Sequence, residues 1–216
     1  MQLPKVEVES LAQITYRHIK QAIIKQEFGD GPLIEAALSS QLGVSKTPVR
    51  QALQRLALEG FVQIDARRGA YVVALTSADV VELFGVREAL EAYAIDQGFP
   101  RLHRDIFSTL EALVGAAGSA LQDHEAFQQR DREVHAFIVG AAGNSRLSRM
   151  YETVSDHMKA MQIRAITVPG RSERSHQEHL DVLRAIATGP DTLARRQLID
   201  HIRSVRDSLL SHLTKD

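Results

Sequence analysis

The feature that most constrains the fold is a short helical pattern that is followed at once by a hairpin pattern. In "VSKTPVRQALQRLALEG", residues 44–60, the apolar residues Val49, Leu53 and Leu56 recur at i, i+4 and i+7. This spacing places them on one face of a helix of about three turns. The remaining residues are mostly polar or basic. The predicted helix therefore has an apolar back and a front that carries hydrogen-bond donors.

Turn and cap residues predict where this helix starts and stops. Thr47 is expected to be its N-cap and Pro48 its first residue, because proline lacks the N–H that has no partner at that position. Gly60 is expected to end the helix, since glycine adopts the left-handed conformation that follows many helices. With its N-cap included, the helix is therefore predicted at 47–59.

The neighbouring patterns complete a small domain. Helices are predicted at 11–26, 35–42 and 47–59, and strands at 61–64 and 70–73. A Gly-containing turn joins the second helix to the third, which is typical of a helix-turn-helix. A turn that contains Gly69 separates the two strands and predicts a β-hairpin. Three helices followed by a hairpin with a basic tip describe a winged helix-turn-helix.

The rest of the sequence contains only amphipathic helical patterns. Ser77 is expected to cap the first helix of this region. Six helices are predicted at 78–97, 101–121, 124–142, 145–166, 172–187 and 191–213, separated by segments rich in Gly, Pro and Asn. The predicted fold class is therefore mainly α. Residues 1–75 are expected to form a winged helix-turn-helix DNA-binding domain, and residues 76–216 an all-α helical bundle for effector binding and dimerisation.

Charge is unevenly distributed over a chain whose net charge is -1. Residues 1–75 contain nine basic and seven acidic residues. Residues 76–216 contain 17 basic and 20 acidic residues. Between Val44 and Ala70, five basic residues stand against two acidic ones. Such a local basic surface suits contact with phosphates, although a solvated charged face is the alternative.

Composition excludes several classes of protein. The chain has no cysteine, which excludes a disulfide framework and thiolate chemistry, and its 44% hydrophobic content is enough for a packed core. The first residues lack the pattern of a signal peptide, and no stretch approaches the roughly 20 apolar residues that cross a bilayer. A cytoplasmic protein with no membrane partner is expected.

Four polar residues of the second region lie on apolar helical faces. Asp131 and His135 are four residues apart and share a face with Ile138, and His179 and His201 lie on apolar faces of two other helices. Three imidazoles and a carboxylate from different helices suit a divalent transition metal such as Zn, Ni or Mn. They also leave coordination positions for a small anion. At each of these positions, the alternative to a metal ligand is a buried polar residue that is hydrogen-bonded within the core.

Longer segments resemble a known family. "GPLIEAALSSQLGVSKTPVRQALQRLALEGFVQIDARRGAYV" resembles the winged helix-turn-helix of the GntR superfamily. The segments "VVELFGVREALEAYA", "DREVHAFIVGAAGNSRL" and "EHLDVLRAIATGPDTLARRQLIDHI" resemble the FCD domain of its FadR-type branch. A bundle of six helices is similar to the shorter, VanR-type variant of that domain.

The resemblance implies a homodimer that binds a double-stranded operator with an inverted repeat. A small carboxylate effector would complete the coordination of the metal and change the affinity for the operator. The resemblance implies that the metal ligands are Asp131, His135, His179 and His201, which leaves His176, one turn before His179, outside the site. It also implies that Arg87 helps to hold an acidic effector, with an ion pair to a neighbouring glutamate as the alternative.

DNA contacts are predicted at two places. The predicted contact residues are Ser45, Lys46, Thr47, Arg50 and Gln51 at the start of the third helix, and Arg67, Arg68 and Gly69 at the tip of the hairpin. Two residues depart from the family pattern. Ala36 stands where the family usually has a basic residue, and Lys46 stands where arginine is common. Lysine lacks the planar fork that binds guanine through two hydrogen bonds.

The leading hypothesis is a metabolite-responsive transcription regulator, a repressor rather than an activator. One alternative is a metalloenzyme that uses the His/Asp site, because metal-bound water can become a nucleophile. Against it, the sequence offers no general base: Glu178, beside His179, is expected to project to another face. A constitutive DNA-binding dimer without an effector is the other alternative.

Overall fold

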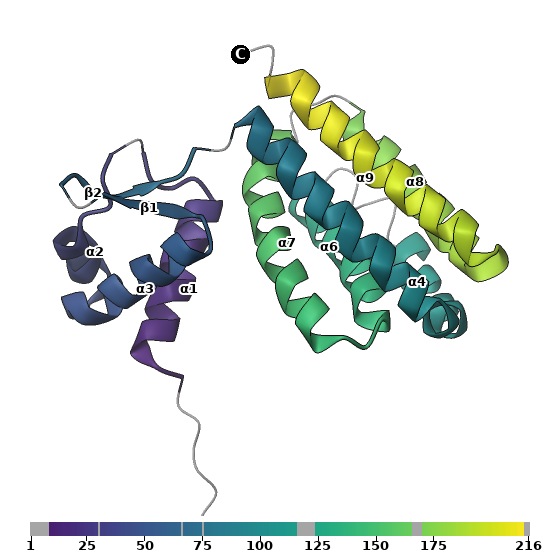
Figure 1. Cartoon of the computed structure of the whole chain (residues 1–216), viewed down its shortest axis with the longest axis horizontal. Helices are drawn as coiled ribbons and strands as arrows, with labels where there is room; N and C mark the ends of the chain where they lie inside the picture. Colours follow the sequence, from purple (N-terminus) through teal and green to yellow (C-terminus); the bar gives the residue numbers. More distant parts are fainter. Residues whose placement is uncertain are drawn as a thin grey trace, which may run out of the picture. The chain divides into compact units, whose positions relative to one another are not determined.

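The computed structural model describes residues 9–29, 31–65, 67–74, 76–115, 124–165 and 170–213, with side chains except at 107–115, 124–125 and 162–165. The chain divides into two compact units, Met1–Ala74 and Leu75–Asp216 (Figure 1). Each unit has its own apolar core. No helix in the described ranges is both long enough and apolar enough to cross a membrane.

Three helices and a hairpin form the described part of the first unit (Figure 1). The elements are α1 (Leu11–Ile24), α2 (Glu35–Leu42), α3 (Lys46–Leu58), β1 (Val62–Asp65) and β2 (Gly69–Val72). The two strands pair antiparallel, with Val62 opposite Val72. Leu33 adds one bridge to this sheet, because its N–H donates to the carbonyl oxygen of Ala70 at 2.7 Å. The predicted winged helix-turn-helix is confirmed.

The apolar face of α3 forms the centre of this unit. Val49, Ala52 and Leu56 are completely buried, at 0% exposure, in a cluster that also contains Ile19 of α1 and Phe61. The face expected from helical spacing is therefore the buried one. Because this face is fixed against the core, the polar side of α3 remains at the surface.

The start of α3 differs from the prediction. The helix begins at Lys46, and Ser45 is its N-cap with an extended backbone, so the prediction that Thr47 caps the helix is wrong. Pro48 is then the third helical residue instead of the first. The first four N–H groups of a helix have no partner within the helix, so proline removes no helical hydrogen bond at this position either.

Five helices make up the described part of the second unit. They are α4 (Ser77–Gly115), α6 (His124–Ala141), α7 (Ser145–Ala165), α8 (Arg171–Thr188) and α9 (Asp191–Leu213). α4 packs along α9 and α6, and α8 packs along α9 (Figure 1). The last four agree with the predicted ranges to within one residue. The all-α bundle is therefore confirmed as a fold class.

A break at Pro100 was expected, and this prediction is wrong. A single helix, α4, runs through Pro100. Leu102 and Ile106, beyond the proline, are completely buried in the same core as Phe84 and Ile95 before it. Packing on both sides of Pro100 outweighs the hydrogen bond that proline removes. The described part of the bundle therefore contains five helices where six were expected, and 116–121 of the second predicted helix lie outside the described residues.

Gly98 has a packing role in place of the predicted helix end. A Cβ atom at Gly98 would lie 2.8 Å from the backbone carbon of Ala141 and 2.9 Å from the backbone nitrogen of Ala142. The absence of a side chain therefore lets α4 approach the end of α6. The start of α4 also differs: Thr76, not Ser77, caps it, since Thr76 Oγ1 accepts from the Asp79 N–H at 3.2 Å.

Candidate functional site

The second unit brings four predicted ligands to one point. Asp131 and His135 come from α6, His179 from α8 and His201 from α9, and all four are buried. One side-chain oxygen or nitrogen from each lies within 4.8 Å of the others. Nε2 of His135 lies 3.2 Å from Nε2 of His179 and 3.3 Å from Nε2 of His201. Nε2 of His179 lies 3.5 Å from Oδ1 of Asp131.

A buried carboxylate fixes the orientation of His135. Nδ1 of His135 lies 2.5 Å from Oε2 of Glu91 on α4, and Glu91 is completely buried. Nε of Arg87 donates to the other oxygen of Glu91 at 2.8 Å. Arg87 is 2% exposed and forms the ion pair that the sequence left open as the alternative to effector binding. Since Nδ1 of His135 faces Glu91, Nε2 of His135 points toward the other three residues of the cluster.

A second carboxylate orients His201 in the same way. Nδ1 of His201 lies 2.8 Å from Oε2 of Glu178, which also accepts from Nη2 of Arg171 at 2.6 Å. Ser204 Oγ donates to the other Glu178 oxygen at 2.6 Å. Glu178 was expected to project away from the site because it neighbours His179 in sequence. It instead reaches the imidazole of His201 on the next helix.

Burial decides the protonation of these groups. Desolvation lowers the pKa of His179 well below its usual value and lowers that of His201 to about 4. Burial would raise the pKa of Asp131, but the neighbouring imidazoles and Arg87 hold it well below the usual carboxyl range. Burial would likewise raise the pKa of Glu178, but hydrogen bonds from His201 and Arg171 lower it to about 2. At neutral pH, His179 and His201 are therefore neutral imidazoles, and Asp131 and Glu178 are ionised carboxylates.

This arrangement fits a metal ion. Nδ1 of His135 and Nδ1 of His201 each face a carboxylate, so their Nε2 atoms, 3.3 Å apart, both face the centre of the cluster. A metal ion at that centre would be held through the Nε2 lone pairs of neutral imidazoles. Three imidazole nitrogens and one carboxylate oxygen are ligands that Zn, Ni and Mn accept.

Sequence reasoning missed several residues around these ligands. Glu91 lies on the same inward face of α4 as Phe84 and Ala94, so helical spacing alone was sufficient to find it. Tyr151 of α7 is also buried, and a hydrogen bond to Glu91 adds to the burial that raises its pKa. No sequence signal pointed to Arg171. His176, one turn before His179, is half-buried and does not belong to the cluster.

The predicted DNA-contacting residues all lie on the surface of the first unit. Those of the third helix and its N-cap are exposed: Ser45, Lys46, Thr47, Arg50 and Gln51. Arg67, Arg68 and Gly69 at the hairpin tip are exposed as well. Oδ1 of Asp65 accepts from the backbone N–H groups of Arg67 at 2.7 Å and Arg68 at 2.9 Å, which holds the tip in shape. Gly69 has a φ of 94°, a conformation that favours glycine.

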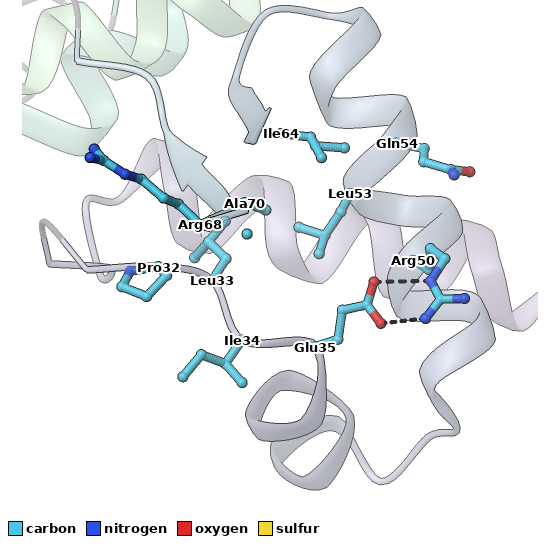
Figure 2. Close-up of a pocket in the computed structure, with 11 residues that line it drawn as sticks. Pro32, Leu33, Ile34, Glu35, Arg50, Leu53, Gln54, Ile64, Arg68 and Ala70 are labelled. Atoms are coloured by element: carbon cyan, nitrogen blue, oxygen red, sulfur yellow. Dashed lines mark hydrogen bonds and ion pairs between the residues drawn. The ribbon is translucent and has the colours of Figure 1, made fainter. Parts of the chain in front are cut away.

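A hollow of about 610 Å³ lies between α2, α3 and the hairpin (Figure 2). Arg50, Gln54 and Arg68 contribute polar groups to its lining, and Leu33 and Leu53 contribute apolar ones. Arg50 makes two hydrogen bonds to Glu35 inside this region. Polar side chains from α3 and from the hairpin therefore both line this hollow.

Comparison with known proteins agrees with this architecture. Residues 11–72 match the model of bacterial regulatory proteins of the gntR family, and residues 82–204 match the FCD domain. The HTH-type transcriptional regulator YdhC of Bacillus subtilis is 25% identical over 191 residues, covering 86% of this chain and 85% of that protein. The gluconate operon transcriptional repressor of Bacillus subtilis is 24% identical over 186 residues, covering 82% of this chain and 75% of that protein.

A solved structure has the same fold. Escherichia coli McbR/YncC superposes with a TM-score of 0.77 at 20% identity, covering 94% of this chain and 99% of that chain. A winged helix-turn-helix followed by an FCD bundle defines a transcription regulator. The chain belongs to the GntR family of bacterial regulatory proteins and carries an FCD domain. Its family and relatives are regulators and not enzymes, which decides against the metalloenzyme.

Proposed function

We propose that this protein is a metabolite-responsive repressor of the FadR-type branch, whose FCD domain binds a divalent metal and a small carboxylate effector. The observation that carries the proposal is the buried cluster of Asp131, His135, His179 and His201. When bound, the metal would supply open coordination positions for a carboxylate. The four side chains would hold it, and Glu91 and Glu178 would keep His135 and His201 in the tautomer that presents Nε2.

The winged helix-turn-helix would bind the operator. The start of α3 would enter the major groove, with Ser45, Lys46, Thr47, Arg50 and Gln51 near bases and phosphates. Arg67, Arg68 and Gly69 would contact the minor groove or the phosphates beside it. Because cations that bind phosphates release counterions, the affinity for DNA should fall steeply with salt.

The exposed face of α4 supports a homodimer. Val81, Val86 and Tyr93 are each about half exposed, and they lie on one side of α4 with the small residues Gly85 and Ala89. Exposed apolar side chains gathered on one helix face are typical of a protein interface. A symmetric dimer would bind an inverted repeat whose half-sites are about one helical turn apart or less.

The effector must distinguish two states of the dimer to regulate it. A ligand changes DNA affinity only if it binds the DNA-competent and the incompetent arrangement with different free energies. Similarity to a gluconate operon repressor supports repression and a small acidic metabolite. The proposal places the protein in the cytoplasm, where bacterial operators lie.

A thermal-shift screen of small carboxylic acids tests the proposal. It is run on metal-loaded protein and on protein stripped with a chelator, since a ligand that binds only the native state raises the unfolding temperature. Acids that raise it only in the presence of metal support the proposed site. Acids that act without metal would move the effector site elsewhere. No effect of metal or of any acid would instead favour a constitutive DNA-binding dimer.

A further inference from the structure

A carboxylate from a neighbouring helix holds the guanidinium of Arg50. Nε of Arg50 donates to Oε1 of Glu35 at 3.0 Å, and Nη2 donates to Oε2 at 2.8 Å, so the pair is bidentate (Figure 2). The side chain of Arg50 is 61% exposed and that of Glu35 is 32% exposed. The contact therefore fixes the plane of a guanidinium that remains open to solvent.

The bidentate contact leaves one edge of Arg50 free. A guanidinium has five N–H donors, and Glu35 uses two of them along the Nε–Nη2 edge. The Nη1–Nη2 edge keeps two parallel N–H groups. Such an edge matches the O6 and N7 acceptors that guanine presents in the major groove. Arg50 is thus held in a form that can bind one base through two hydrogen bonds.

The charge of Glu35 is unusual for a surface that meets phosphates. Glu35 is the only charged residue of α2, and it lines the same hollow as Arg50, Gln54 and Arg68 (Figure 2). Hydrogen bonding to Arg50 lowers the pKa of Glu35, and the charge of Lys46 adds to this, so Glu35 is ionised at neutral pH. An anion at this place weakens the attraction for phosphates of any sequence.

We propose that Glu35 is a positioning residue for sequence selectivity, which holds Arg50 so that its Nη1–Nη2 edge binds a guanine. This inference rests on the proposed DNA-binding function. A guanidinium that is fixed in advance loses less conformational freedom on binding. The same carboxylate weakens contacts that do not depend on sequence. Both effects favour the correct operator over other DNA.

The test uses the full-length protein and two duplexes of the same length. One duplex is selected by the unsubstituted protein from a random-sequence pool, and the other has a mixed sequence. The ratio of the two dissociation constants measures selectivity. For Glu35→Gln we expect this ratio to fall about tenfold or more, because Arg50 is no longer oriented to make its pair of hydrogen bonds to one base. Binding to the mixed-sequence duplex should be unchanged or tighter.

A second substitution separates positioning from other effects. Arg50→Lys removes the planar fork, so it should also lower the selectivity. The double variant Glu35→Gln/Arg50→Lys should be no less selective than Arg50→Lys alone, because Glu35 acts through Arg50. Glu9→Gln is the matched control. It removes the carboxylate of another exposed pair in the same unit, at 2.7 Å from Arg17, and should leave the selectivity unchanged.

The outcomes distinguish the inference from the proposed function. Unchanged selectivity in Glu35→Gln would overturn the inference and leave the DNA-binding function intact. Equal loss of binding to both duplexes, together with a lower unfolding temperature, would overturn it as well, since that result indicates a structural role. If the unsubstituted protein enriches no sequence from the pool, the proposed function fails and the inference fails with it.

Discussion

Nδ1 of His135 lies 2.5 Å from Oε2 of Glu91, although the two residues are 44 positions apart in the sequence. A carboxylate on the far nitrogen of a metal-binding imidazole typically raises metal affinity 10- to 100-fold. We therefore expect Glu91→Gln to weaken metal binding by about that factor, measured by competition with a chromogenic chelator. Glu88→Gln, which removes a more exposed carboxylate from the same helix, should leave metal affinity unchanged.

Glu91 also partners the buried Arg87, so Glu91→Gln is expected to lower the stability of the metal-free protein. Glu178→Gln provides the second test, because Glu178 is 22% exposed and contacts His201 in the same way. If both variants keep the metal affinity of the unsubstituted protein, the orienting role of the two carboxylates is wrong.

The imidazole of His179 should be essential for the response to metal. We expect Zn, Ni or Mn to raise the unfolding temperature of the unsubstituted protein, and His179→Ala to abolish that shift and any shift that an acid adds. Binding to operator DNA without effector should persist. His176→Ala is the matched control, since His176 lies on the same helix and outside the cluster. Loss of operator binding by a folded His179→Ala protein would make the metal structural.

The close approach of α4 and α6 should make Gly98 intolerant of a side chain. A Cβ there meets backbone atoms at 2.8 and 2.9 Å, which forces the two helices apart. We expect Gly98→Ala to destabilise the protein by about 1–3 kcal/mol in denaturant unfolding. Gly140→Ala is the control: a Cβ at Gly140 meets nothing within 4 Å. That variant should gain up to about 1 kcal/mol from helix propensity.

The exposed face of α4 predicts how the proposed dimer can be disrupted. Val86 is 47% exposed on that face, and a charge there would be buried without a partner in an α4-mediated interface. We expect Val86→Glu to convert the protein to monomer in analytical ultracentrifugation. Met150→Glu on α7 introduces the same charge at a site that is 59% exposed. If both variants sediment as dimers, the interface lies elsewhere.

The carboxylate of Glu59 should make the first unit sensitive to acid. Burial would raise its pKa, but hydrogen bonds from Lys20 and Tyr16 lower it below the usual value of 4.5. The folded state therefore holds the proton less tightly than the unfolded state does. The stabilisation is complete above pH 4.5 and is lost as the pH falls below that value. The protection of the α1 and α3 amides, measured as the hydrogen-exchange rate relative to the intrinsic rate at each pH, should fall in acid, and much less so in Glu59→Gln.

Glu59→Gln itself should be less stable at neutral pH. Lys20 donates to Glu59 at 2.8 Å and its side chain is 10% exposed, so it would lose the ionised partner. A cost on the order of 1–3 kcal/mol is expected. Glu9→Gln serves as the control for both measurements, because the Glu9 pair with Arg17 is exposed. Equal acid sensitivity in Glu59→Gln and the unsubstituted protein would assign the effect to other groups.

Much of the fold was predictable because its signals are local. Helical spacing identified the buried face of α3 and all four residues of the His/Asp cluster, since apolar periodicity depends only on neighbours within a few turns. The order of three helices and a hairpin was equally visible in the sequence. The predicted N-caps were wrong by two residues at α3 and by one at α4, because neighbouring Ser and Thr residues compete for the same role.

What the sequence by itself determined was which faces are apolar and which residue types lie on them. Only the tertiary structure decided that α4 continues through Pro100, and that Glu91, Glu178 and Glu35 serve His135, His201 and Arg50. These partners lie 44, 23 and 15 positions apart. Contacts of this kind depend on how separate helices pack, and local periodicity carries no information about which residues of different helices will meet.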